Sequence, residues 1–123
     1  MQDPIKKQLP LTEGVFHILL SLSDGPRHGY GIMQEVKERT NGRVHLGPGT
    51  LYGAIKRLIK RELIEEIERA PETPTEEARR YYRLTHLGGL VLRAESVRLE
   101  EMVRHARQKR QLPELPEQIG GTA

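Results

Sequence analysis

The chain lacks cysteine and tryptophan and has a single phenylalanine, and aromatic residues make up only 4% of its 123 residues. Without cysteine, neither disulfide bonds nor thiolate metal sites are available. Without a supply of large aromatic side chains, the hydrophobic core has to be built mainly from leucine, isoleucine and valine. Because a small domain buries a low fraction of its surface, so thin a core favours completion by a second subunit.

Several classes of protein are disfavoured by further absences. No apolar run approaches the roughly 18 residues that cross a membrane, and the charged N-terminus is not followed by the apolar stretch of a signal peptide. We therefore expect a cytoplasmic protein without membrane contact. Five scattered histidines show no metal-ligand spacing, so no metal and no cofactor are expected. No nucleophile with a base, glycine-rich phosphate loop or pair of buried carboxylates is recognisable, which argues against an enzyme.

Positive charge is concentrated in the N-terminal half of the chain. The net charge is only +3, but residues 1–62 carry ten basic and six acidic side chains, whereas residues 63–85 carry four and six. Four of these cations fall within six positions, namely Lys56, Arg57, Lys60 and Arg61. The distribution of charge is therefore more informative than its sum, and it directs attention to this segment.

Hydrophobic periodicity predicts four helices and one hairpin. The expected helices cover residues 12–22, 29–40, 48–61 and 87–109, and the expected strands cover residues 63–68 and 79–85. Thr12 is a typical N-cap, Asn41-Gly42 tolerates the left-handed conformation of a helix end, and Pro48 suits a first helical position. Three short helices followed by a hairpin is the order of a winged helix.

The third predicted helix separates an apolar face from a cationic one. Its apolar side chains follow the spacing of one buried stripe: Leu51, Ile55, Leu58 and Ile59. The opposite face carries Gly49, Gly53, Lys56 and Lys60, flanked by Tyr52 and Arg57. Lysine and arginine neutralise phosphates or donate to guanine edges, and glycine permits close approach of the backbone. Thr50, beside the helix N-terminus, can donate to a phosphate together with free N–H groups.

The last predicted helix has two apolar stripes when it is projected at 100° per residue. The first stripe contains Leu87, Leu90, Val91, Ala94, Val97 and Met102. The second contains Leu92, Leu99, Val103 and Ala106. Since a surface helix of a monomer needs only one stripe, we predict that one packs on the chain's own domain. The second stripe is then the expected homodimer contact.

Three ordered motifs resemble those of the PadR family of bacterial transcriptional regulators. They are Gly25-Pro26-Arg27-His28-Gly29-Tyr30-Gly31-Ile32, then Gly47-Pro48-Gly49-Thr50-Leu51-Tyr52 with Arg57-Leu58, and Tyr81-Tyr82-Arg83-Leu84-Thr85 closed by Gly88. The resemblance spans about residues 11–107. It implies a winged-helix domain, a C-terminal dimerisation helix and repression relieved by a small effector. A single such helix is typical of the shorter branch of the family.

The wing departs from the family pattern. Glu62 stands where the family often has glycine, and the tip is acidic where the family is commonly basic. The tip acids are Glu72, Glu76 and Glu77. Because acids repel phosphates, we expect the tip to point away from DNA. Arg79 and Arg80, at the base of the second strand, are then the expected wing contacts.

The sequence therefore predicts a mainly α fold of the α+β class, a winged helix-turn-helix with a two-stranded wing. The expected parts are a flexible arm (1–10), a winged-helix DNA-binding domain (11–86), a dimerisation helix (87–110) and a disordered tail (111–123). We expect a dimeric, sequence-specific regulator, a repressor that binds a palindromic double-stranded operator under effector control. The predicted DNA contacts are Gly49, Thr50, Tyr52, Gly53, Lys56, Arg57, Lys60, Arg79 and Arg80.

Other interpretations of the same residues stay open at this point. The basic face can be an ordinary solvated surface on a winged helix used for protein contacts without specific DNA binding. Tyr52 can simply pack at the edge of the apolar stripe, and Tyr30 is expected to be structural, between the first two helices. Arg79 and Arg80 can merely balance the wing acids. Steep weakening of DNA binding by salt separates DNA contact from protein contact.

Overall fold

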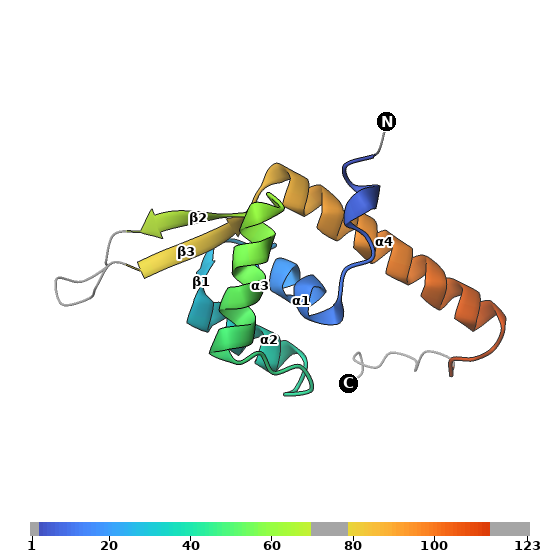
Figure 1. Ribbon diagram of the computed structural model, residues 1–123. Coiled ribbons are helices and arrows are strands. Elements are labelled where there is room, and N and C mark those ends of the chain that lie inside the picture. The colour runs from blue at the N-terminus through green and yellow to red at the C-terminus, as the bar shows by residue number, and fades with distance from the viewer. Residues whose placement is uncertain (1–2, 70–78, 114–123) are drawn as a thin grey trace.

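The computed structural model describes residues 3–69 and 79–113. The helices and strands pack around a single core, and the distal part of the last helix extends beyond it (Figure 1). The elements are η1 (Lys6–Gln8), α1 (Glu13–Ser21), β1 (Arg27–His28), α2 (Gly29–Arg39), α3 (Pro48–Lys60), β2 (Ile64–Arg69), β3 (Arg79–Leu84) and α4 (His86–Gln108). This order confirms the predicted α+β class and winged-helix arrangement.

Local chemistry sets the helix ends within one residue of the predicted ones. The Thr12 hydroxyl accepts a hydrogen bond from the Val15 N–H at 3.2 Å, which caps α1. Asn41 and Gly42 end α2 with φ angles of 53° and 78°, a left-handed conformation that asparagine and glycine tolerate. Pro48 occupies the first turn of α3, where its missing N–H costs nothing.

The wing belongs to a three-stranded antiparallel sheet with strand order β1-β3-β2. β2 runs along the whole of β3, with Ile64 opposite Leu84. β1 adds a short third strand that pairs with Tyr81 and Tyr82. The predicted two-stranded wing missed β1, because a strand of two residues has no periodicity that a sequence pattern can reveal.

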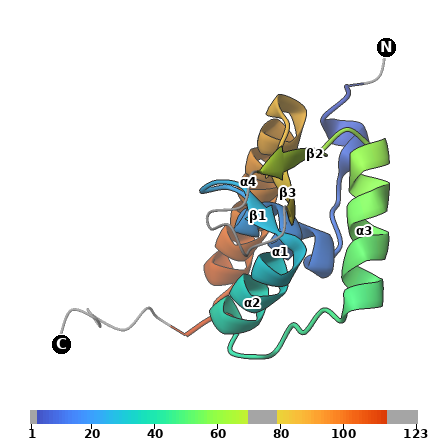
Figure 2. The same ribbon diagram turned by 90° about the vertical axis from the view of Figure 1, so that its left-hand side faces the viewer.

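The core lies between α1, α2, α3, the sheet and the first half of α4. Its buried members are Ile18, Leu19, Leu22, Ile32, Val36, Leu51, Ala54, Ile55, Leu58, Leu63, Ile64, Tyr82, Val91 and Leu92. All but Ala54 and Tyr82 are leucine, isoleucine or valine, as the composition predicts. α3 lies along one side of the molecule, with α1 and α2 between it and α4 (Figure 2).

The N-terminal segment is held against the domain, whereas the sequence predicted a flexible arm. Ile5 and Leu9 pack on the core. The Arg61 guanidinium donates to Gln8 twice, to Oε1 at 2.8 Å and to the carbonyl oxygen at 3.2 Å. Residues 3–10 are therefore structured. The prediction weighed only local polarity and prolines, and it did not detect a partner 53 positions away.

A buried acid of α4 fastens this segment to the last helix. Glu95 is 1% exposed, and its carboxylate accepts the Leu11 N–H at 2.9 Å. It also accepts two hydrogen bonds from the Arg98 guanidinium, at 2.6 and 3.0 Å. The bonds from Arg98 are the main reason that the pKa of Glu95 lies below its ordinary value, although burial opposes them.

α4 uses parts of both predicted stripes to pack on its own domain. Val91 of the first stripe is 0% exposed and Leu92 of the second is 7% exposed, and both belong to the core. This corrects the prediction for Leu92, whose side chain is covered by its own domain and not by a partner. Although α4 has 23 residues, neither it nor another helix in the described segments has an apolar stretch suited to crossing a bilayer.

The tail predicted to be disordered, residues 111–123, lies mostly outside the described residues. The structure describes only positions 111–113 of it, directly after the end of α4. Arg110, just before them, has a φ of 61°, a left-handed backbone conformation of the kind that closes helix C-termini. The predicted tail therefore stays a prediction.

Two adjacent glycines of α4 provide a matched test of how closely this helix approaches β2. A Cβ at Gly88 would lie 1.9 Å from the Leu63 carbonyl oxygen, whereas one at Gly89 would have no neighbour within 4 Å. Gly88→Ala should lower the free energy of unfolding by about 2 kcal/mol, because a clash with backbone is not relieved by rotating a side chain. Gly89→Ala should be neutral or raise it by up to about 1 kcal/mol. Urea denaturation measures both, and equal effects would contradict the close approach.

The Glu95 contacts predict a pH dependence of definite sign. Because its folded pKa is lowered, their contribution is complete above the ordinary carboxyl pKa and is lost as pH falls through the lowered value. Glu95→Gln should therefore cost about 1–2 kcal/mol at neutral pH, and its deficit should shrink in acid.

The measurement is urea denaturation at several pH values. Glu101→Gln is the matched control, because Glu101 also pairs with an arginine three residues on but is exposed. A deficit of Glu95→Gln that stays constant with pH, or one equal to that of Glu101→Gln, would contradict the prediction.

Candidate nucleic-acid interface

α3 presents all of its predicted contact residues on one accessible face. Its buried side chains, Leu51, Ala54, Ile55 and Leu58, point into the core. The exposed residues of the opposite face are Gly49, Thr50, Tyr52, Lys56, Arg57 and Lys60, and Gly53 among them is half-buried. The amphipathic spacing of α3 produces this separation, since one stripe faces the core and the other residues face solvent.

Within the described segments, the exposed cations of α3 are not neutralised by acidic side chains. Lys56, Arg57 and Lys60 form no salt bridge with any residue in the described segments. Arg61, the next cation along the chain, is instead engaged by Gln8. Exposed cations without an acidic partner are available to phosphates. We refer to these residues on the outer side of the helix as the α3 face: Gly49, Thr50, Tyr52, Gly53, Lys56, Arg57 and Lys60.

Neither glycine of the α3 face is required by packing inside the protein. A Cβ at Gly49 would have no neighbour within 4 Å, and one at Gly53 would meet only Nη1 of Arg57, at 3.5 Å. Glycine nevertheless destabilises a helix interior by about 0.8–1 kcal/mol relative to alanine. The structural role that both glycines can have is to leave the helix backbone accessible from outside.

The wing sets acids of β2 beside arginines of β3. Arg83 lies opposite Glu65 and donates to it from Nε at 2.7 Å. Nε of Arg80 is 3.3 Å from Oε2 of Glu66. Arg80, a predicted DNA contact, is thus shared with a carboxylate of its own wing. The side chain of Arg79 and the predicted acidic tip, Glu72, Glu76 and Glu77, lie outside the described residues.

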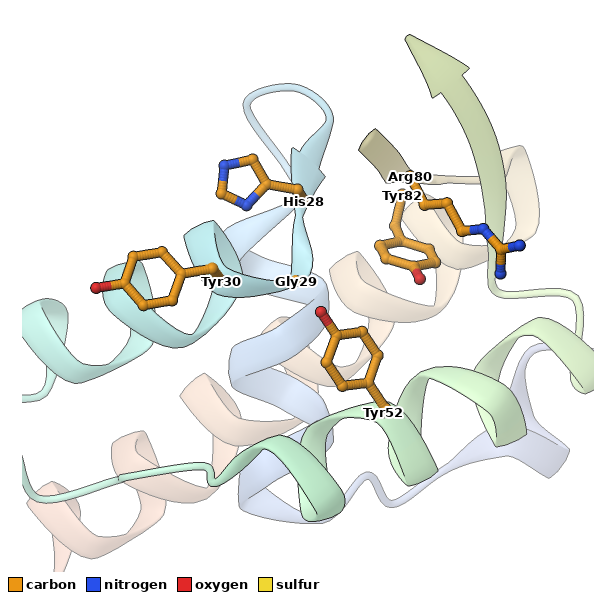
Figure 3. Close-up of a pocket in the computed structure, with 6 residues that line it drawn as sticks. All are labelled: His28, Gly29, Tyr30, Tyr52, Arg80 and Tyr82. Carbon is orange, nitrogen blue, oxygen red and sulfur yellow. The ribbon is translucent and has the colours of Figure 1, made fainter. Parts of the chain in front are cut away.

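A pocket of about 480 Å³ opens between α3, the N-terminus of α2 and β3 (Figure 3). It is lined by His28, Gly29, Tyr30, Tyr52, Arg80 and Tyr82. The Tyr52 hydroxyl rests against Gly29, where a Cβ would lie only 2.1 Å from it. Gly29 is therefore needed for Tyr52 to reach this position. Tyr52 nevertheless stays 46% exposed, so it combines packing with access to solvent.

Tyr30 stands at the rim of this pocket and not between the first two helices as predicted. It is 61% exposed, and its ring stacks on that of His28 with centroids 6.4 Å apart. The ring nitrogen Nδ1 of His28 caps α2 by accepting the Gly31 N–H at 3.0 Å. Within the described segments, no three histidine, cysteine or acidic residues are grouped so as to hold a metal ion.

Tyr82, like His28 and Gly29, is a pocket residue that the sequence analysis did not single out. It stands in the motif Tyr81-Tyr82-Arg83-Leu84-Thr85, which was used only to identify the family resemblance. Its side chain is 5% exposed, and burial is the main cause that raises the pKa of its hydroxyl above the ordinary value. The nearby Glu66 and Tyr52 raise that pKa further. The hydroxyl is therefore a protonated donor at neutral pH.

Comparison with known proteins places this geometry in a family. The model of the transcriptional regulator PadR-like family matches residues 18–94. A PadR family transcription regulator from Clostridium difficile R20291 is structurally similar with a TM-score of 0.69 and 26% sequence identity, covering 79% of this chain and 97% of that one. The structure of Bacillus subtilis PadR in complex with operator DNA gives a TM-score of 0.62 at 21% identity, covering 89% of this chain and 54% of that one.

A curated relative matches over a shorter span. The uncharacterized 37.1 kDa protein in transposon TN4556 of Streptomyces fradiae is 43% identical over 51 residues. That match covers 42% of this chain and 14% of the relative's length. The family match extends from α1 into α4 and includes more than half of the chain, with the α3 face and the wing inside it. The chain therefore belongs to the PadR-like family of transcriptional regulators.

Proposed function

We propose that this regulator binds double-stranded operator DNA as a homodimer, with α3 of each subunit in a major groove. The observation that carries the proposal is the α3 face, whose three cations have no acidic partner in the described segments. Bacillus subtilis PadR was solved with operator DNA, which supports DNA as the partner of this chain too. A two-fold symmetric dimer requires a palindromic operator.

Each residue type of the α3 face has a distinct role in this proposal. Lys56 and Lys60 neutralise phosphates on the two sides of the groove. Arg57 reads a guanine, because a guanidinium can donate to its O6 and N7 together. Gly49 and Gly53 let the helix approach the bases closely. Thr50 donates to a phosphate beside the free N–H groups of the first turn.

The homodimer is inferred from the distal part of α4. On the second stripe, Val103 is 45% exposed, and Leu99 and Ala106 are half-buried. Apolar patches on one element mark interaction surfaces when no part of the domain covers them. Of the predicted dimer contacts, Leu99, Val103 and Ala106 stay in the proposal and Leu92 does not. The α4 helices then set the distance between the two α3 faces.

Repression under effector control completes the proposal. A mostly apolar cavity of about 390 Å³ lies between α1 and α4. It is lined by Leu11, Glu13, Phe16, His17, Glu95 and Leu99. A small apolar effector in this cavity would change the angle at which α4 leaves the domain. The spacing of the α3 faces, and with it the affinity for the operator, would change as a result.

One prediction from this proposal concerns the α3 face. Replacing Lys56 and Lys60 by alanine should weaken binding to DNA from the protein's own promoter region. The slope of log affinity against log salt should also fall by about two, because each lost phosphate contact releases about one counterion fewer. Fluorescence anisotropy at several salt concentrations, with unrelated DNA as competitor, measures both quantities.

The matched control is Arg107→Ala, which removes an exposed cation from the far end of α4. It should leave the affinity and the slope close to those of the parent protein. If the double variant binds like the parent, the α3 face is not the DNA surface, and the winged helix serves protein contacts instead.

Another prediction from this proposal concerns the dimer. Val103→Glu should give a monomer, because two carboxylates would be buried against an apolar surface in the dimer. Light scattering measures the mass, and circular dichroism verifies the fold. Val97→Glu, on the other stripe, is the comparison and should stay dimeric. A dimeric Val103→Glu together with a monomeric Val97→Glu would assign the interface to the first stripe and contradict the proposal.

A further inference from the structure

We propose that the pocket between α2, α3 and β3 is a seat for one backbone phosphate of the operator, held from inside by the Tyr82 hydroxyl. This proposal rests on the proposed DNA-binding function and adds to the α3 face a contact that does not depend on base sequence. It makes Tyr82 and the first turn of α2 part of the nucleic-acid interface.

Tyr82 is the observation that points to a ligand. Its ring belongs to the core and its residue is 5% exposed, yet its hydroxyl is directed into the pocket, toward Tyr52 (Figure 3). No hydrogen bond joins this hydroxyl to a residue in the described segments, and since no enclosed side-chain oxygen there lacks a partner, the hydroxyl reaches the open side of the pocket. A tyrosine hydroxyl carries one O–H donor that it can offer to a partner. The open side of the pocket is where a partner for this hydroxyl can enter.

The groups around the pocket select the chemistry of that partner. The hydroxyls of Tyr82 and Tyr52 supply O–H donors. Gly29 and Tyr30 occupy the first turn of α2, a helix of 11 residues, where N–H groups lack partners within the helix. Arg80 stands at the rim. Hydroxyl donors, a helix N-terminus and a guanidinium together favour an anionic oxygen that accepts several hydrogen bonds, which is the chemistry of a phosphate.

Two acids of β2 face this rim: Glu68 stands opposite Arg80 in the strand register, and Glu66 pairs with Arg80. The pair joins Oε2 of Glu66 to Nε of Arg80 at 3.3 Å, and the Arg80 side chain is 75% exposed. The terminal N–H groups of the guanidinium are thus not engaged by Glu66. An exposed ion pair of this kind contributes little to stability, so a phosphate can recruit Arg80 at small cost.

The position of the pocket favours the DNA backbone as the source of the phosphate. Tyr52 belongs to both surfaces, because it lines the pocket and stands on α3 one turn before Lys56. A strand whose bases meet the α3 face therefore passes the mouth of the pocket. A phosphate seated there would contact α2, α3 and β3 together and would fix the register of α3 in the groove. A phosphate in this pocket would also explain why the wing contacts DNA near the start of β3 and not at its tip.

The test uses variants that remove one hydroxyl and keep the ring. Tyr82→Phe should weaken binding to the operator and to random DNA by the same factor, about ten-fold, because it deletes a hydrogen bond to a charged group. The salt slope should not change, since a neutral donor releases no counterion. Tyr81→Phe, the neighbour on the opposite face of β3, is the control and should stay within about two-fold of the parent. Fluorescence anisotropy measures binding, and urea denaturation verifies that both variants fold.

The possible outcomes separate this proposal from the proposed function. If Lys56 and Lys60 variants lose binding while Tyr82→Phe binds like the parent, the phosphate seat is wrong and the α3 face stands. If Tyr82→Phe weakens operator binding alone, its hydroxyl acts in base recognition and the seat is wrong. Inorganic phosphate tests whether the pocket binds a free anion and not a DNA phosphate. In that case it should stabilise the parent protein against urea but not Tyr82→Phe, and the two proteins should bind DNA equally. That result would overturn the assignment to DNA.

Discussion

Burial of one apolar stripe of α3 orients the proposed DNA surface. Leu51, Ile55 and Leu58 are at most 2% exposed, and the packing of α3 on α2 and β2 prevents the helix from rotating about its axis. Fully burying each such side chain contributes about 1.5–3 kcal/mol, so a rotation that exposed them would cost a large part of the stability of the domain. The same constraint turns Lys56 and Lys60 outward, where no acid of the described segments neutralises them.

Close backbone contacts at two glycines bring the other parts of the surface to α3. Gly29 admits the Tyr52 hydroxyl, which joins the start of α2 to α3, and Gly88 admits the Leu63 carbonyl, which joins α4 to the start of β2. Both glycines stand in or beside the motifs that resemble the PadR family. Their role is steric, because a Cβ would overlap its neighbour at either position. The pocket depends on the contact at Gly29, and the orientation of α4 depends on the contact at Gly88.

Glu95 connects the DNA-binding domain to the helix that is proposed to join two subunits. It bonds the residue that enters α1 and also Arg98 on its own helix, at the point where α4 leaves the core. The cavity proposed for an effector borders the same side chain. A change at this position would therefore be transmitted to the angle of α4. Rearrangement of a helix at a subunit interface is a common form of such control.

The amino-acid sequence alone determined the four α-helices, the two longer strands and the side of α3 that carries charge. Caps, turns and periodicity act over a few residues, so Thr12, Asn41-Gly42 and Pro48 predicted helix ends to within one residue, and the stripe of α3 predicted its cationic face. The three motifs were also sufficient to indicate the family to which the chain belongs.

Only the tertiary structure decided which residues meet across the chain. The pairing of β1 with β3, the contact of Arg61 with Gln8, the placement of Leu92 in the core and the convergence of Tyr52 and Tyr82 all join segments that are distant in sequence. The projection of α4 could not assign its stripes, because the domain ends partway along the helix and covers parts of both. Local patterns report the period of an element, whereas the depth at which its neighbours cover it is a property of the packed fold.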